Sequence, residues 1–151
     1  MLIVLAVFAS FAFAGGGGGL DHSNPISQKI KATCTSGTTN VSFVDVVYRS
    51  WDGDAGEEED FVSTNIVIET NGQVARYFNW YGSLLNSIRT SRALEMQKVS
   101  LMDHKYNEAY FDIAIDFKSG SGALAAARYA GKVHEFYPPF LTLNLNNCVL
   151  K

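Results

Sequence analysis

The chain has 151 residues, a net charge of -3 and an apolar fraction of 47%, which is sufficient for one domain with its own core. Its pI is near 5.5 and its basic residues are scattered. Binding to a nucleic-acid phosphate backbone needs a basic face, so we expect no nucleic-acid partner.

The first 14 residues form an apolar run that ends in Ala12-Phe13-Ala14, the small-x-small pattern of a signal-peptidase site. The run is shorter than the about 20 residues that span a bilayer, and it lacks the usual preceding Lys or Arg. We expect a signal peptide at 1–14, a flexible glycine-rich leader at 15–27 and a single β domain at 28–151. The mature protein is then soluble, periplasmic or extracellular, and without a transmembrane segment.

The chain has two cysteines, Cys34 and Cys148, which lie near the two ends of the expected domain. In an exported protein such a pair predicts a disulfide. Closing so long a loop removes on the order of 5 kcal/mol of unfolded-state freedom in the chain-entropy model. The alternative is a cysteine–histidine dyad, which would leave the second cysteine without a role.

Alternation of apolar and polar residues predicts two strands at the start of the domain. Ile30, Ala32 and Cys34 alternate with polar residues, which places the cysteine on a buried face. Residues 41–49 are apolar on both faces, as in a strand that is covered on both sides.

The stretch from Trp51 to Asp60 is acidic, and we expect it to be a surface loop. A calcium site is one interpretation, because clustered carboxylates supply the oxygens that this ion prefers. The spacing does not match an EF-hand loop, and the alternatives are a solvated loop or a contact with a basic partner. The carboxylates are Asp52, Asp54, Glu57, Glu58, Glu59 and Asp60.

Asn71-Gly72 predicts a two-residue hairpin turn between strands at 61–70 and 73–80. This register places Ile66 opposite Tyr77 on the core side. The second strand continues into Phe78, Trp80 and Tyr81, and alternation cannot bury all of these rings. The exposed rings indicate either a platform for a sugar or peptide, with Trp51 and Tyr48 as additions, or packing between layers of the fold.

The second half of the chain predicts a short helix at 83–92, then further strands. Residues 93–102 shift phase near Gln97 or Lys98, which indicates a β-bulge. The strand at 123–129 is rich in alanine, and its small side chains would let another element approach closely. The remaining strands are expected at 109–117, at 132–137 and from Phe140 to Leu145.

No motif predicts catalysis. The histidines, His22, His104 and His134, lack the spacing of a metal-binding pair. Asp112 and Asp116 could divide acid and base roles, although outward carboxylates on a strand are ordinarily solvated.

About eight short strands predict an all-β fold, an antiparallel β-sandwich first and a small β-barrel as the alternative. We expect a binding module for a glycan, peptide or protein. The alternatives are an enzyme that acts on an envelope or extracellular polymer, and a structural exported protein. The candidate binding residues are Trp51, Phe78, Trp80, Tyr81, Asp52, Asp54, Glu57 and Glu58.

Overall fold

The computed structural model describes residues 25–52, 57–79, 83–85, 92–132 and 135–151. These residues form antiparallel strands and no helix. The strands are β1 (Pro25–Ser36), β2 (Thr39–Asp52), β3 (Glu57–Thr70), β4 (Gln73–Phe78), β5 (Ala93–Met102), β6 (Glu108–Asp116), β7 (Ser121–Ala127) and β8 (Leu141–Leu150).

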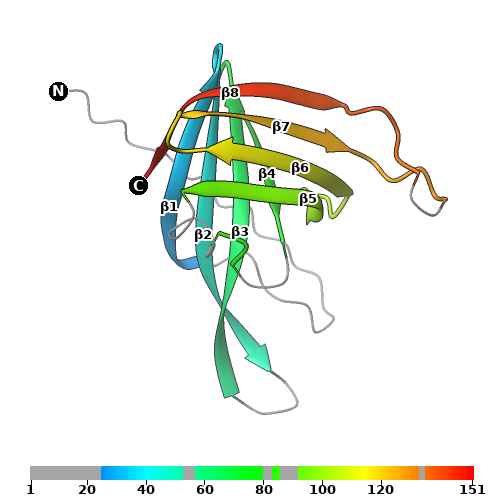
Figure 1. Cartoon of the computed structure of the whole chain (residues 1–151). Helices are drawn as coiled ribbons and strands as arrows, with labels where there is room; N and C mark the ends of the chain where they lie inside the picture. The colour runs from blue at the N-terminus through cyan, green and yellow to red at the C-terminus, as the bar shows by residue number, and fades with distance from the viewer. Residues whose placement is uncertain (1–24, 53–56, 80–82, 86–91, 133–134) are drawn as a thin grey trace.

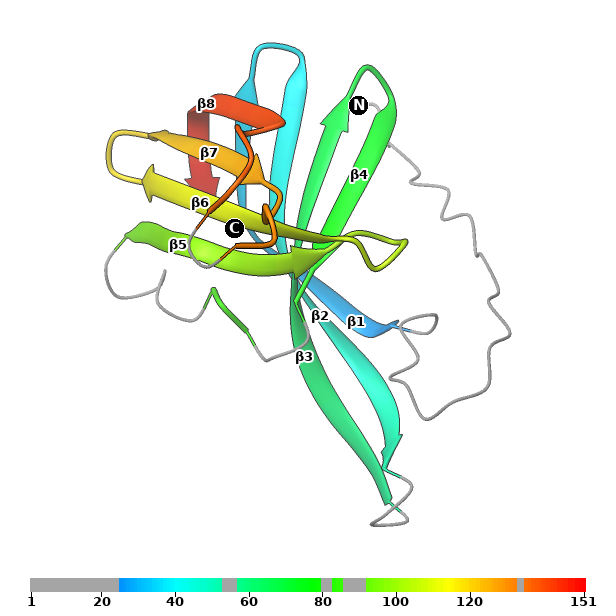
Figure 2. The ribbon, with the colours of Figure 1, turned by 90° about the vertical axis from the view of Figure 1, so that its right-hand side faces the viewer.

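The eight strands form one sheet that closes into a barrel, with every strand beside its neighbours in sequence. Strands β1 to β4 run across strands β5 to β8 (Figures 1 and 2). The two halves meet at narrow seams, because β4 and β5 share one residue pair, Phe78 with Met102, and β1 and β8 share three. The all-β prediction is confirmed, and of the two predicted architectures the structure has the barrel.

The barrel interior is filled by side chains that alternate inward along the strands. Phe43 and Phe111 are fully buried, and Tyr77 packs edge-on against Phe111 with ring centroids 4.9 Å apart. Leu141 and Leu143 on β8 are half-buried and pack against this core. Its other large members are Val41, Ile66, Leu85, Leu94, Leu101, Ile113, Leu124 and Leu145.

The predicted hairpin between β3 and β4 is confirmed residue by residue. Thr70 pairs with Gln73 and Ile66 with Tyr77. Asn71 and Gly72 have φ angles of 51° and 78°, the left-handed conformation that a type I′ turn requires. The Asn-Gly pair therefore fixes which side chains of both strands enter the core.

The prediction of a surface loop from Trp51 to Asp60 is wrong for residues 51–52 and 57–60, which lie in strands. Strand β2 continues to Asp52 and β3 begins at Glu57, which leaves residues 53–56 outside the described part of the chain. The ladder pairs Trp51 with Glu58, and this end of the hairpin projects beyond the rest of the barrel (Figures 1 and 2). The backbone pairing of β2 with β3 continues through these residues, so the acidic composition did not end the strands.

Three other predicted boundaries change. Strand β1 begins at Pro25, ahead of the expected start at Gln28. In the described part of the strand expected at 132–137, which leaves out residues 133 and 134, Phe136 forms a single bridge with Tyr129. Residues 83–85 of the predicted helix form a turn, and residues 86–91 lie outside the described residues. Ser83 and Leu84 donate hydrogen bonds to side chains of β2 and β3.

Asp45 on β2 is the centre of a polar network that includes these hydrogen bonds, and its side chain is buried. Its carboxylate accepts hydrogen bonds from Ser83 Oγ at 2.8 Å and from Thr64 Oγ1 at 3.1 Å. Lys31 Nζ lies 3.3 Å from the same carboxylate, and the backbone N–H of Leu84 donates to Thr64 Oγ1. An unpaired buried charge is costly, so these contacts stabilise the carboxylate of Asp45. They also hold residues 83–85 against the strands, and Leu85 is buried in the core.

The predicted disulfide between Cys34 and Cys148 is present. Both cysteines are buried, and they join β1 to β8 at the seam with three residue pairs. The bond therefore closes the barrel where the hydrogen-bond ladder is short.

We predict that replacing both cysteines, Cys34→Ala with Cys148→Ala, lowers the free energy of unfolding by about 2–5 kcal/mol. The reason is that the reduced chain regains the freedom of a loop spanning 114 positions. Urea unfolding of the oxidised protein, the variant and the wild type in reductant provides the measurement. Equal urea midpoints for all three proteins would contradict a stabilising role of the disulfide.

Strand β7 lies very close to β6 at Gly122. A Cβ atom at this position would lie 2.4 Å from the carbonyl oxygen of Ala114 and 2.9 Å from Ile115 Cα. Strand β7 begins at Ser121, two residues before the expected start at 123.

We predict that Gly122→Ala destabilises the protein by about 1–3 kcal/mol, because the added methyl group must displace backbone. The control is Ala123→Ser at the adjacent exposed position, which should change the urea midpoint little. A Gly122→Ala variant as stable as the wild type would show that the two strands can move apart freely.

Candidate functional site

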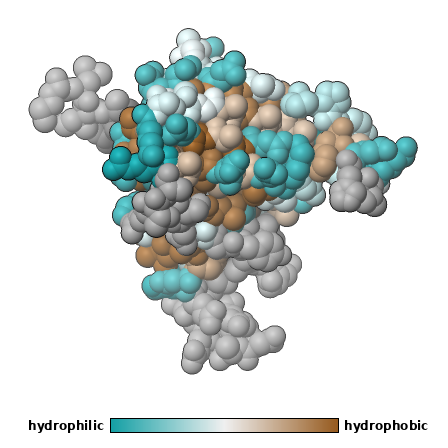
Figure 3. All heavy atoms as spheres, viewed as in Figure 1, coloured by the Kyte–Doolittle hydropathy of each residue, from teal (hydrophilic) through white to brown (hydrophobic). Residues whose placement is uncertain are grey.

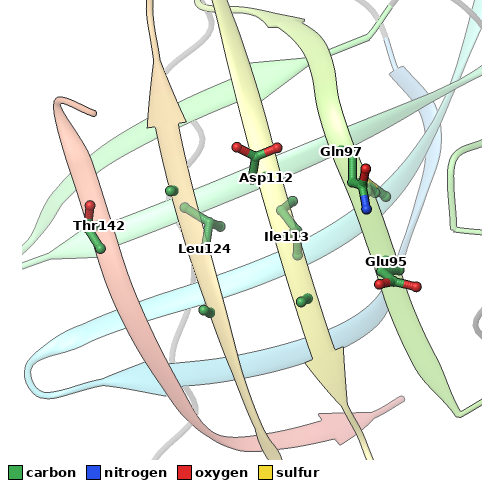
Figure 4. A pocket seen from close by; sticks show the side chains of 10 residues that line it. Glu95, Gln97, Asp112, Ile113, Leu124 and Thr142 are labelled. Carbon is green, nitrogen blue, oxygen red and sulfur yellow. The ribbon is translucent and has the colours of Figure 1, made fainter. Parts of the chain in front are cut away.

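The outer face of β5 to β8 carries a shallow groove of about 370 Å³, which we call the outer groove (Figure 4). Small side chains make its floor: Ala114 on β6 and Ala123 and Ala125 on β7. These residues alternate with Ile113 and Leu124, which point into the barrel core. The groove follows from this alternation, because bulky side chains face inward and methyl groups face outward.

Polar side chains border the floor on both sides. Glu95 and Gln97 stand on β5, Asp112 on β6 and Thr142 on β8 (Figure 4). They supply two carboxylates, an amide and a hydroxyl, so the rim both donates and accepts hydrogen bonds. The face as a whole shows apolar residues between hydrophilic ones (Figure 3).

The predicted β-bulge is confirmed, and it shapes one side of the groove. The register of β5 on β6 shifts between Met96 and Val99, and Lys98 has a φ of 49°. The backbone N–H of Lys98 donates to Asp112 Oδ1 at 2.9 Å, and its ammonium group bonds Oδ2. Burial alone would raise the pKa of Asp112, but these hydrogen bonds and the charge of Lys98 lower it below its ordinary value.

A group of three rings, which we call the aromatic group, continues the same face beyond Asp112. Tyr110 lies two residues before Asp112 on β6, and its ring centroid is 5.1 Å from Phe136 and 6.2 Å from Tyr129. Lys98 Nζ lies 5.1 Å from the Phe136 centroid, so one side chain links the groove to the rings. Burial raises the pKa of Tyr110, and the hydrogen bond with Glu108 raises it further by a smaller amount.

The aromatic group is accessible to a ligand. Tyr129 is 41% exposed although it contacts both other rings. In the connection between β7 and β8, Tyr137 and Phe140 are also exposed, and Arg128 lies 5.5 Å from the Phe140 centroid. Exposed rings that neighbours already hold in place offer contact area with little further loss of side-chain entropy.

The predicted binding residues are only partly described. Trp80, Tyr81 and Asp54 lie outside the described residues. The backbones of Trp51, Asp52, Glu57 and Glu58 are described in the projecting hairpin, and those of Asp52 and Glu57 pair with each other. The side chains of these four residues lie outside the description, so the combined aromatic and acidic site stays a prediction.

Phe78 is half-buried on β4, where its ring packs edge-on against Tyr106 at 6.2 Å. Phe78 pairs with Asn65, whereas Trp51 pairs with Glu58, and Glu58 and Asn65 are seven positions apart on β3. At the rise of an antiparallel strand this separation is about 23 Å. Phe78 and Trp51 therefore lie beside well-separated positions of β3.

Sequence reasoning missed the outer groove, although it identified two of its components. The alanine-rich strand and the outward Asp112 were recognised separately, but their adjacency depends on the pairing of Asp112 with Ala125 across β6 and β7. The bulge at Lys98 was the signal that could have connected them, because a bulge re-aims a side chain next to a site.

Among the described residues, no group of three or more His, Cys, Asp or Glu side chains is placed to hold a metal ion. Calcium at residues 52–60 stays a prediction. Within the same described ranges, no helix is long and apolar enough to cross a membrane. No known protein family, curated protein or solved structure matches this chain.

The ion pair of Asp112 gives a testable dependence on pH. The carboxylate has a lowered pKa in the folded protein, so its stabilising contribution is complete above the unfolded-state value of about 3.9 and is lost as pH falls through the folded value. Both side chains are more than one-third exposed, so we expect about 0.2–1 kcal/mol from the pair at neutral pH.

We predict that Asp112→Asn is slightly less stable than the wild type at pH 7. The difference should shrink as pH falls below about 3.9 and disappear only below the lowered pKa of the folded carboxyl group, where both proteins carry a neutral side chain. Urea unfolding across this range measures it, with Glu95→Gln as the control at the opposite side of the groove. A difference that grows on acidification would contradict the ion pair.

Proposed function

We propose that this chain is an exported binding module whose ligand surface is the outer groove together with the aromatic group. The observation that carries the proposal is the continuity of these two features along one face. Lys98 contacts both Asp112 at the groove and Phe136 in the aromatic group. The buried disulfide is compatible with the oxidising compartment that export implies.

The ligand class that fits this surface best is a glycan. A sugar presents hydroxyl groups at its edges and C–H groups on its faces. The floor of Ala114, Ala123 and Ala125 suits the C–H faces, and the rim of carboxylates, amide and hydroxyl suits the edges. Tyr129 offers an accessible ring beside the groove for a neighbouring sugar. The shallow, open form of the groove suits a segment of a longer chain.

A hydrolase that acts on such a polymer is the second candidate, because Glu95 and Asp112 border the same groove. Glu95 pairs with Ala114, so Asp112 is diagonal to it, and diagonal residues in an antiparallel ladder lie roughly 7–8 Å apart. Inverting glycosidases use carboxylates at about this separation. Binding is favoured because Glu95 is solvated, whereas a general acid in these enzymes occupies a desolvated site.

We predict that Ala123→Trp, which fills the floor, and Tyr129→Ala, which removes the accessible ring, each weaken glycan binding by about tenfold or more. Calorimetric titration with soluble neutral, amino-sugar and acidic oligosaccharides, peptidoglycan fragments included, identifies the ligand and measures the loss. The matched control is Val74→Trp, which adds the same ring on exposed β4.

Failure of every oligosaccharide class to bind the wild type, or equal losses in Val74→Trp, would contradict the glycan proposal. Release of new reducing ends during the same titrations, abolished by Glu95→Gln, would instead support the hydrolase.

A further inference from the structure

Strand β8 changes partners in its middle. Residues 141–145 pair with β7, whereas the pairs with β1 involve Asn146, Val149 and Leu150. Asn147, with a φ of 49°, lies at this bend. Among the described strands, β8 therefore has no ladder partner along 141–145 on the side away from β7. Both views show β8 as the outermost strand of its half of the barrel (Figures 1 and 2).

This edge lacks the usual protection against strand addition. Natural edge strands carry charges, a bulge or a central proline that discourage pairing with another chain. No charged residue occurs from Phe136 to Leu150, and the prolines Pro138 and Pro139 lie before the strand rather than within it. The side chains of Leu141 and Leu143 remain half-exposed at this edge.

The edge sequence is complementary to itself. Antiparallel pairing about Leu143 places Leu141 opposite the partner's Leu145, and Thr142 opposite the partner's Asn144. Leucines then meet on the core face and polar side chains meet on the outer face, where Thr142 and Asn144 are exposed. The register also joins no like charges, since the strand has none.

We propose that the β8 edge at residues 141–145 is a docking surface for a second copy of this chain, which adds by antiparallel pairing about a two-fold axis. The two β5–β8 halves then form one continuous sheet. A five-residue edge is about 17 Å long. It buries far less than the roughly 1,600 Å² of a standard stable interface, so the dimer is weak and depends on protein concentration.

Sedimentation equilibrium over a concentration series, from low micromolar to near-millimolar, tests the dimer. We expect the wild type to pass from monomer towards dimer. Thr142→Lys with Asn144→Lys should keep the monomer, because each lysine then faces a lysine of the partner. The matched control, Val74→Lys at an exposed position on β4, should associate like the wild type.

A charge-reversed partner makes the test specific for β8. Mixing the double lysine variant with Thr142→Glu and Asn144→Glu should restore a heterodimer, since opposite charges now pair across the edge. A wild type that stays monomeric, a lysine variant that associates as the wild type does, or a mixture that fails to associate would each overturn the proposal.

The dimer does not depend on the proposed glycan function. Asn144→Lys alone leaves every residue lining the outer groove unchanged. Oligosaccharide titrations at low protein concentration report on the monomer. The dimer can therefore be refuted while glycan binding is found, and glycan binding can be refuted while the dimer is found.

Discussion

Closure of the sheet between β8 and β1 is the constraint on which the rest of the structure depends. Strand β8 leaves β7 after Leu145, bends at Asn147 and reaches β1 with few ladder pairs. The Cys34–Cys148 bond lies at this seam, and the backbone N–H of Cys148 donates to the carbonyl of Gly120 at 2.9 Å. The covalent bond thus supplies the connection that a longer ladder would otherwise provide.

The same closure decides what the two faces of β5 to β8 can do. The inner face lies over β1 to β4 and must fill the barrel, so it uses Phe111, Ile113 and Leu124. The outer face carries the packed aromatic group at one end and, beside it, alanines that leave a groove. These alanines are exposed or half-buried and are not part of the core, which is why the groove suggests a ligand.

Local patterns predicted much of this fold, because the relevant interactions are local. Asn71-Gly72 determined its hairpin register, and the phase shift near Lys98 revealed the bulge. The choice between sandwich and barrel depends on whether strands distant in sequence, such as β1 and β8, share hydrogen bonds. Alternation within a strand carries no information on that pairing, so the sequence left both architectures open.

The prediction for the acidic stretch was wrong for a related reason. Charge density was interpreted as the end of the strands, but the ladder between β2 and β3 continues through the charged residues to the pair of Asp52 and Glu57. Arg49 and Asp60 show how charges fit such a ribbon, since they pair across the strands with Nε and Oδ1 3.1 Å apart. Asp45 is a buried charge instead. Its carboxylate is stabilised there by Lys31, Ser83 and Thr64.

The candidate site was harder to predict because each of its parts comes from a different strand and each part has an ordinary interpretation alone. Asp112 looked like a solvated outward carboxylate, and the alanines looked like a close-packing surface. Pairing across β6 and β7 makes them neighbours, and the bulge directs Lys98 onto both Asp112 and the aromatic group. Thr142 links this site to the chain's last strand, because it borders the groove and also stands on the free edge of β8. In the proposed dimer the sheet extends beyond Thr142 and the two proposed glycan surfaces lie on one face, where both would act together on a single long polymer.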